Sequence, residues 1–356
     1  MATSTPTTSN RDLLTSGPRP ANPFTFSTGD TKILVTYKGD KIEGLVSSHA
    51  LSMASPVWKN FIYPPWNTQN AGGDNGAADG TKSIDCSEDD GEALLVLMNI
   101  VHLKFVSVPK KPTLDALVQV AQLCEQYQCV SIVAPWVNLW KTNCPLTRGP
   151  HELLFVSWTF GWGDTFKILA HVLVQCITIS EVGVPLDGRW MPMVGLMPPG
   201  ILDKILEIRI ATLDSLLAIA AIEISRYTSG PRPVCRQIPS SQRSWDSMKD
   251  SERLWCDEKS LRRLRLDLAG IGWPLRSGSE CNKNVVSVSA LLCSIKARAR
   301  VAIGRTTLEL DHRDCCSANF LSDPEKVISE IKSPVLDSHI EHMRIQRTKL
   351  GMMKED

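Results

Sequence analysis

The residue types best suited to chemistry lie in the second half of the chain, where histidine and cysteine could hold a metal ion. His312 and Cys315 stand three positions apart, and Cys235 and Cys256 lie upstream. A structural zinc site needs four nitrogen or sulfur ligands in a tetrahedron, so these four residues are its candidates. Their spacing matches no zinc pattern, and ordinary thiols with an ordinary histidine are the simpler interpretation. We therefore favour no metal and keep a structural zinc as the alternative.

Catalytic motifs are missing from the sequence. HELLF (151–155) begins like a zinc-protease motif, but Phe155 stands where the second histidine is needed. GWGDTF (161–166) has two glycines of a nucleotide-binding loop and lacks the third. Neither a GxxxxGK[ST] phosphate loop nor a G-x-S-x-G elbow is present. We expect a protein that is not an enzyme, with no catalytic residues and no cofactor.

The charge distribution suggests a second alternative. The formal net charge is +1, but Arg232–Arg305 contains 15 Lys/Arg against 7 Asp/Glu. KSLRRLRLDL (259–268) and KARARVAIGR (296–305) are the basic stretches there. Arg262, Arg263 and Arg265 do not all share one helical face with a stacking aromatic. A solvated helix face is the simpler account. A nucleic-acid-linked regulator using residues 232–305 is the alternative, and we expect no nucleic acid among the principal partners.

The sequence also bears on location. The first 20 residues lack the apolar run of a secretory signal. The most apolar window, ILAHVLVQCITI (168–179), is short and interrupted by His171 and Gln175. We expect no membrane association and a place in the cytoplasm and/or the nucleus, where the 11 cysteines would stay reduced.

The elements of the first half alternate between strands and helices. Two β-prone runs, Lys32–Tyr37 and Lys41–Val46, flank Gly39-Asp40 and predict a hairpin. Pro56 is tolerated at the first position of a helix and not in its interior. HALSMA and PVWKNFI are therefore two short helices, with Ser55 as the cap of the second.

A short strand and three helices follow. Lys82–Asp85 is the predicted strand, and Ser87, three residues before Asp90, is the predicted cap of a helix over Ala93–Leu103. Apolar residues at helical spacing predict a further helix from Pro112 to Tyr127, and another over Ser131–Trp140.

After residue 150 the pattern is almost entirely helical. HELLFVSWTF and DTFKILAHVLVQCITI are separated by Gly161 and Gly163, with Asp164 as the predicted cap of the second. PPG (198–200) precedes a long helical run to Tyr227, and shorter helices are expected over 259–268, over 286–301 and after 311.

With these elements placed, residues 30–142 resemble a BTB/POZ domain. The resemblance rests on Gly29-Asp30 before strand ILV, on V-x-x-x-x-L-x-x-x-S-P-x-W from Val46 to Trp58, and on EDDGEALLVLMNIVH, LDALVQVAQLCEQYQC and WVNLW. The following segments HELLFVSWTFGWGDTFKIL and PPGILDKILEIR resemble the helical extension of fungal BTB proteins. The core and interaction positions of this motif are Asp30, Val46, Leu51, Ser55, Pro56, Trp58 and Phe61. On the two short helices around Pro56, we expect the side chains of Leu51, Val57 and Phe61 to pack inward.

The resemblance implies a protein-binding role. Dimeric members pair an Asp near the first strand with a basic residue before the first short helix; Asp30 is present, but Ser47-Ser48 carry no charge. Members that bind cullin scaffolds carry a hydrophobic-x-Glu motif in the loop before the helix at 112, and here KFVSVPKKP has no Glu. The implied partners are proteins, including a second copy as a homodimer, and the motif does not support a cullin.

We therefore predict an α+β protein, in which a BTB/POZ domain (a small mixed sheet with a helical cluster) precedes an all-α domain. The predicted divisions are a disordered tail at 1–28, the BTB/POZ domain at 29–144 with a mobile loop at 65–81, a helical extension at 148–228, a linker at 229–252 and a C-terminal helical region at 253–356. The expected function is a non-enzymatic adaptor or scaffold, acting by self-association or partner recruitment, including recruitment to a ubiquitin ligase.

Overall fold

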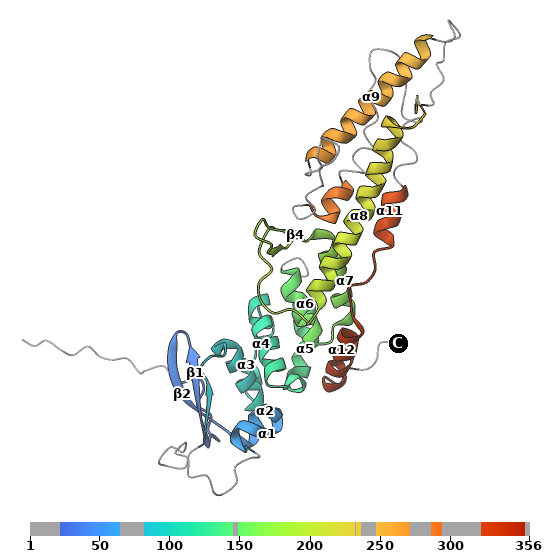
Figure 1. Cartoon of the computed structure of the whole chain (residues 1–356). Coiled ribbons are helices and arrows are strands. Elements are labelled where there is room, and N and C mark those ends of the chain that lie inside the picture. The colour runs from blue at the N-terminus through green and yellow to red at the C-terminus, as the bar shows by residue number, and fades with distance from the viewer. Residues whose placement is uncertain are drawn as a thin grey trace, which may run out of the picture. The chain divides into compact units, whose positions relative to one another are not determined.

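The computed structural model describes residues 22–64, 82–144, 149–231, 233–235, 247–270, 286–293 and 322–352 (Figure 1). The chain forms two compact units, Met1–Pro109 and Lys110–Asp356. The division falls inside the segment 29–144 assigned above to one domain, and the functional domain boundaries remain predictions. The tail before residue 22, the loop 65–81, His312 and Cys315 lie outside the described residues.

The first unit is built on a three-stranded sheet in the order β2-β1-β3 (Figure 1). β1 (Thr31–Tyr37) pairs antiparallel with β2 (Asp40–Val46) and parallel with β3 (Lys82–Cys86). The predicted hairpin and third strand are confirmed. The turn residues are Lys38 and Gly39, one position earlier than predicted, with φ of +54° and +90°. Positive φ at both central residues is the geometry that joins twisted antiparallel strands in two residues.

The two predicted short helices are present as α1 (Ser48–Ala54) and α2 (Pro56–Ile62). The Ser55 hydroxyl accepts a hydrogen bond of 3.0 Å from the Trp58 N–H, as expected of a cap residue. Val46, Leu51 and Trp58 are fully buried. These observations confirm the predicted break at Pro56.

The expected inward packing of Phe61 is wrong. Its side chain is 54% exposed, and Val57 is only partly buried. The buried face of α2 is set by Trp58 and Ile62, which lie one helical turn apart. Phe61 points about 100° away from Ile62, since successive helical residues are rotated by that angle.

The helix α3 (Gly91–Val101) packs against β1. Its cap is Asp90, whose carboxylate accepts from the Ala93 N–H at 2.8 Å, so the predicted Ser87 cap is wrong. Ser87 instead donates its N–H to Asp85 in the turn after β3. Gly91 is required because a Cβ there would lie 2.3 Å from the Thr36 carbonyl oxygen on β1. The 3₁₀ turn η1 (Phe105–Ser107) follows.

The second unit begins with four helices and one 3₁₀ turn, and these confirm the predicted helical segments. They are α4 (Leu114–Gln126), η2 (Val130–Val133), α5 (Ala134–Asn143), α6 (Pro150–Thr159) and α7 (Gly163–Cys176). Asp164 lies inside the first turn of α7, and the N-cap is Trp162, which corrects the predicted cap. A carboxylate in that turn still favours the helix through its dipole.

A small two-stranded sheet follows, formed by β4 (Thr178–Ile179) and β5 (Pro185–Leu186). Further helices in the described part of the chain include α8 (Ile201–Thr228), α9 (Ser247–Gly270), α11 (Ser322–Ser329) and α12 (Asp337–Lys349). The long helix α8 contacts α7 and α11 (Figure 1). None of the described helices is long and apolar enough to cross a membrane. The chain as a whole is α+β.

Candidate protein-interaction surface

The N-terminus of α1 is held by a carboxylate that precedes β1. The Asp30 carboxylate accepts hydrogen bonds from the N–H and the hydroxyl of Ser48, both at 2.6 Å. These two bonds, side chain first, hold the pKa of Asp30 below its ordinary value. Asp30 is therefore hydrogen-bonded to Ser48. The resemblance implied a basic residue at this position as its partner.

A second residue fastens the same helix end from α3. The Ser47 N–H donates to Nε2 of His102 at 3.0 Å, while Nδ1 of His102 lies 2.8 Å from the Met98 carbonyl. Only Nδ1 can donate to that carbonyl, so His102 is the neutral Nδ1–H tautomer. Burial lowers the pKa of His102, which keeps the ring neutral. The Phe26 ring stacks on it with centroids 3.8 Å apart.

The residue after His102 ends α3 in an unusual way. Leu103 has a φ of +61°, a left-handed conformation that disfavours a branched side chain. The N–H of Leu103 bonds to the Ile100 carbonyl and that of Lys104 to the Asn99 carbonyl. This pair of bonds is the Schellman helix ending, whose left-handed position glycine usually occupies.

The side chains at this ending face solvent. Leu103 is 74% exposed, Phe105 is 50% exposed and Val106 is fully exposed. We call Leu103, Phe105 and Val106 the α3 loop surface. Three large apolar side chains in four residues, one of them held in a strained conformation, are the arrangement expected of a contact site for another protein.

Further exposed apolar side chains lie on the short helices. They are Met53 on α1, Phe61 on α2 and Tyr63 just after it. The Tyr63 hydroxyl donates to the Ser48 hydroxyl at 3.3 Å, and the Lys82 amine lies 3.7 Å from the centre of its ring. Tyr63 is therefore fixed in position, while Met53 and Phe61 are available to a partner.

The predicted metal ligands are only partly described. Cys235 and Cys256 are both buried. Asp257 accepts from the N–H groups of Val234 and Cys235, at 2.8 and 3.0 Å, and so holds their backbone in place. In the described part of the chain no three His, Cys, Asp or Glu side chains form a group that could hold a metal ion. His312 and Cys315 lie outside it.

The basic region is likewise described in part. Arg262 and Arg265 are exposed on α9, and the Lys259 amine lies 3.7 Å from the centre of the Trp255 ring. Residues 271–285 and 294–321 lie outside the described residues.

Sequence reasoning missed the α3 loop surface. The sequence predicts a helix end and a loop for LKFV (103–106) and no binding site there. The available signal was the placement of Leu103, Phe105 and Val106 in a segment with no strand or helix to bury them.

No protein-family model, curated protein or solved structure matches this chain. The BTB/POZ resemblance therefore rests on the sequence motifs.

Proposed function

We propose that the chain is a non-enzymatic protein-interaction module, an adaptor or scaffold in which residues 29–144 act as a BTB/POZ-like domain. The observation that carries this proposal is the α3 loop surface, where Leu103 holds a left-handed conformation and is 74% exposed. A glycine at this position would serve the helix ending better. A leucine at this position with its side chain in solvent is consistent with a role in binding rather than in the fold.

The arrangement of the first unit supports the family part of the proposal. The order of elements is the predicted one: the hairpin, the two short helices around Pro56, the third strand and then α3. Leu51 and Trp58, the apolar markers of the motif, are core residues. The helices α6, α7 and α8 would then be the extension that fungal BTB proteins carry.

The residues also narrow how such a domain would bind. Asp30 is bonded to Ser48, so self-association through an Asp–basic pair has no basic member here. The α3 loop surface lies in the loop where cullin adaptors carry hydrophobic-x-Glu, and it supplies the apolar residues without the Glu. We therefore propose a partner that meets this loop with an apolar surface. The site of action would be the cytoplasm or the nucleus, where exposed thiols such as Cys293 stay reduced.

Affinity purification with mass spectrometry tests the proposal. The wild-type chain is compared with Phe105→Ser/Val106→Thr and with the control Ile222→Ser, which changes an exposed apolar residue on α8. Proteins enriched with the wild type and the control should be lost with the double variant. A cullin among them would assign the ubiquitin-ligase role. Identical protein sets for all three chains would contradict the proposal.

A further inference from the structure

The α3 loop surface contains one positive charge. Lys104 stands between Leu103 and Phe105 and is itself exposed. Its amine lies 4.3 Å from the centre of the Phe26 ring. That ring is buried and stacks on His102, so it is fixed in the fold. The ammonium is therefore held at a defined place beside the exposed apolar side chains, by its attraction to an aromatic face.

The charge of Lys104 is not neutralised within the described part of the chain, where no Asp or Glu forms an ion pair with it. The surrounding sequence agrees, since residues 93–114 contain three lysines and no Asp or Glu. The charge also acts on its neighbour. Burial is the main cause that lowers the pKa of His102, the bond to the Met98 carbonyl raises it, and the Lys104 charge lowers it further. An ammonium has several N–H donors, and a ring face takes up only one side of it.

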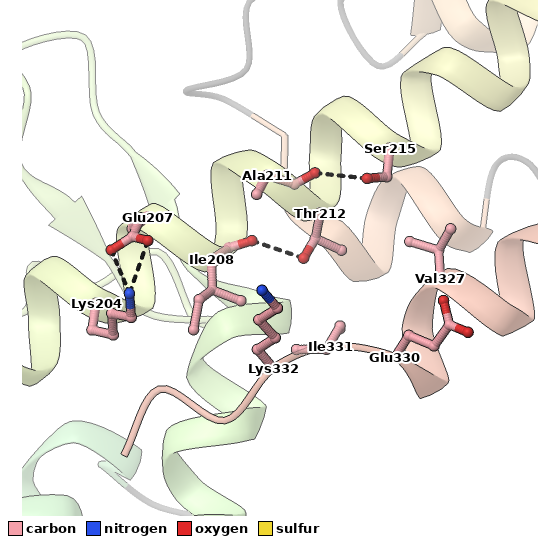
Figure 2. A pocket seen from close by; sticks show the side chains of 10 residues that line it. All are labelled: Lys204, Glu207, Ile208, Ala211, Thr212, Ser215, Val327, Glu330, Ile331 and Lys332. Carbon is pink, nitrogen blue, oxygen red and sulfur yellow. Dashed lines mark hydrogen bonds and ion pairs between the residues drawn. The ribbon is translucent and has the colours of Figure 1, made fainter. Parts of the chain in front are cut away.

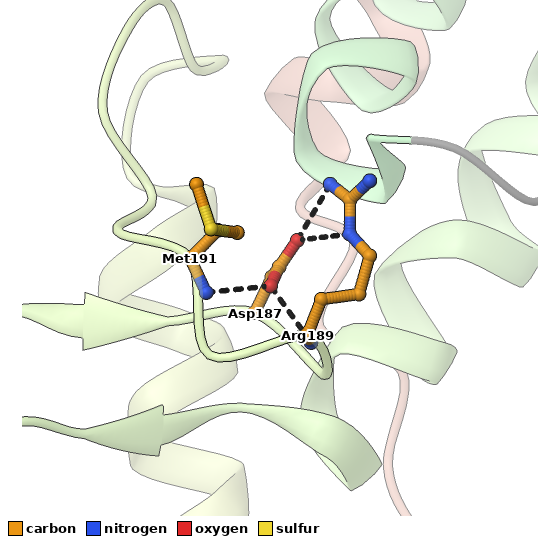
Figure 3. Close-up of polar contacts among 3 residues, drawn as sticks. All are labelled: Asp187, Arg189 and Met191. Carbon is orange, nitrogen blue, oxygen red and sulfur yellow. Dashed lines mark hydrogen bonds and ion pairs between the residues drawn. The ribbon is translucent and has the colours of Figure 1, made fainter.

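The Trp190 turn (Asp187–Met191) of the second unit shows a contrast. Trp190 is 65% exposed and has a φ of +63°, so this turn also presents a large apolar side chain on left-handed backbone. The Arg189 guanidinium beside it donates to the buried Asp187 carboxylate, at 2.8 and 3.0 Å (Figure 3). The cation of this turn is therefore already neutralised within the chain.

A groove of about 330 Å³, lined by α8, by α11 and by the residues that follow α11, shows the same contrast (Figure 2). The Lys204 amine lies 2.8 Å from both carboxylate oxygens of Glu207. Glu330 lies 4.0 Å from the Lys326 amine. These charges are paired within the chain, whereas that of Lys104 is left to a partner.

We propose that the α3 loop surface binds acidic–apolar segments of other proteins, in which a large apolar side chain has an Asp or Glu within about one helical turn of it. This inference rests on the proposed function and adds the chemistry of the partner. Leu103, Phe105 and Val106 meet the apolar side chain, and Lys104 meets the carboxylate. Neighbouring residues lie about 3.8 Å apart along the chain, so one short segment makes both contacts. An ammonium already held on a ring loses little entropy when it binds.

The charges favour a peptide over an anionic membrane. Segments that bind anionic lipid carry clusters of about 4–8 Lys and Arg. Residues 93–114 contain three lysines. One positioned ammonium between apolar side chains matches a single carboxylate better than a lipid surface.

The test begins with a random-peptide phage library, selected on the full-length wild type and counter-selected on Phe105→Ser/Val106→Thr. The recovered peptides are synthesised as selected and with every Asp and Glu replaced by Asn and Gln. Fluorescence anisotropy then measures their affinity for the wild type, Lys104→Arg, Lys104→Gln and Lys104→Glu. The matched control is Lys41→Glu, which reverses an exposed lysine at the start of β2, the end away from α1.

The recovered peptides should combine large apolar residues with Asp or Glu. Lys104→Gln should weaken their binding about two- to fivefold, the effect of losing an exposed ion pair. Lys104→Glu should weaken it about five- to twentyfold, because reversal adds a repulsion of similar size. Lys104→Arg and Lys41→Glu should bind like the wild type, and the amide peptides should lose affinity as Lys104→Gln does.

The outcomes separate this inference from the proposed function. If the acidic and amide peptides bind equally, or if Lys104→Glu binds like the wild type, the acidic part is overturned while the α3 loop surface remains a binding site. If no peptide distinguishes the wild type from Phe105→Ser/Val106→Thr, both are contradicted. Binding of the wild type, but not of that double variant, to phosphatidylserine vesicles without any such peptide would overturn the inference in favour of a lipid surface.

Discussion

The N–H of Ser47, at the start of α1, donates a hydrogen bond of 3.0 Å to Nε2 of His102, 55 residues later at the end of α3. This bond requires an unprotonated Nε2, because a protonated ring would turn an N–H toward another N–H. The attachment of the short helices to α3 therefore depends on the charge of one imidazole.

This relationship predicts a dependence of stability on pH. Burial lowers the pKa of folded His102 below the ordinary 6.5, so the unfolded chain takes up the proton first. The contribution of neutral His102 to stability is complete above pH 6.5. It decreases as the pH falls from there toward the pKa of His102 in the folded chain. Urea unfolding across this range should show the loss in the wild type and a smaller loss in His102→Gln, whose amide oxygen accepts without titrating. Since His151 also has a pKa lowered by burial, the difference between the two chains is the quantity to compare. Equal pH dependence of the unfolding free energy in the wild type and in His102→Gln would contradict this role of neutral His102.

The bond between Asp30 and Ser48 should have a measurable energy. Ser48→Ala removes the 2.6 Å hydroxyl bond and keeps the backbone one, so it should destabilise the first unit by about 1 kcal/mol. Asp30→Asn weakens both bonds. In a double-mutant cycle followed by chemical denaturation, the two changes should cost less together than the sum of their separate costs. Strict additivity would mean that the carboxylate does not act through Ser48.

The two faces of the short helices should respond differently to truncation. Leu51→Ala opens a cavity in the core and should cost about 2–5 kcal/mol. Phe61→Ala removes a side chain that is 54% exposed and should change the unfolding free energy by about 0.5 kcal/mol or less. Equal costs measured by urea denaturation would show that Phe61 is a core residue after all.

Leu103→Gly should stabilise the fold. The substitution relieves the left-handed strain of about 1–2 kcal/mol and adds unfolded-chain entropy of about 0.5–1 kcal/mol, leaving a gain of about 0.5–1 kcal/mol. Gln128 holds the same position at the end of α4, with a φ of +52° and the same pair of bonds. Gln128→Gly is therefore a matched control that should gain similarly by thermal or chemical unfolding. A destabilised Leu103→Gly would mean that the leucine side chain supports the fold.

Elements defined by local chemistry could be predicted from the sequence. A proline can only begin a helix and a serine caps it, so Ser55 and Pro56 fixed the boundary between α1 and α2 within one residue. The spacing of apolar residues placed α4 in the same way. These predictions required no knowledge of distant contacts.

Features that depend on tertiary packing could not be predicted. Which side of α2 is buried depends on the orientation of the helix against its neighbours. For that reason the sequence-based prediction that Phe61 packs inward was wrong. The cap of α3 shifted from Ser87 to Asp90 because Gly91 sets where the helix can approach β1. The α3 loop surface and the Trp190 turn both depend on a left-handed residue other than glycine, which propensity disfavours. For the turn, Asp187-Gly188 was a readable signal, since such pairs favour tight turns.

The most direct measurement is the amount of partner protein recovered with Leu103→Gly, relative to the wild type and Gln128→Gly, at equal amounts of folded chain. The account predicts that Leu103→Gly is at least as stable as the wild type and recovers at least about tenfold less partner, as for a hot-spot residue, while Gln128→Gly recovers as much as the wild type. Undiminished recovery with Leu103→Gly would contradict the claim that the α3 loop surface is where this protein meets its partner.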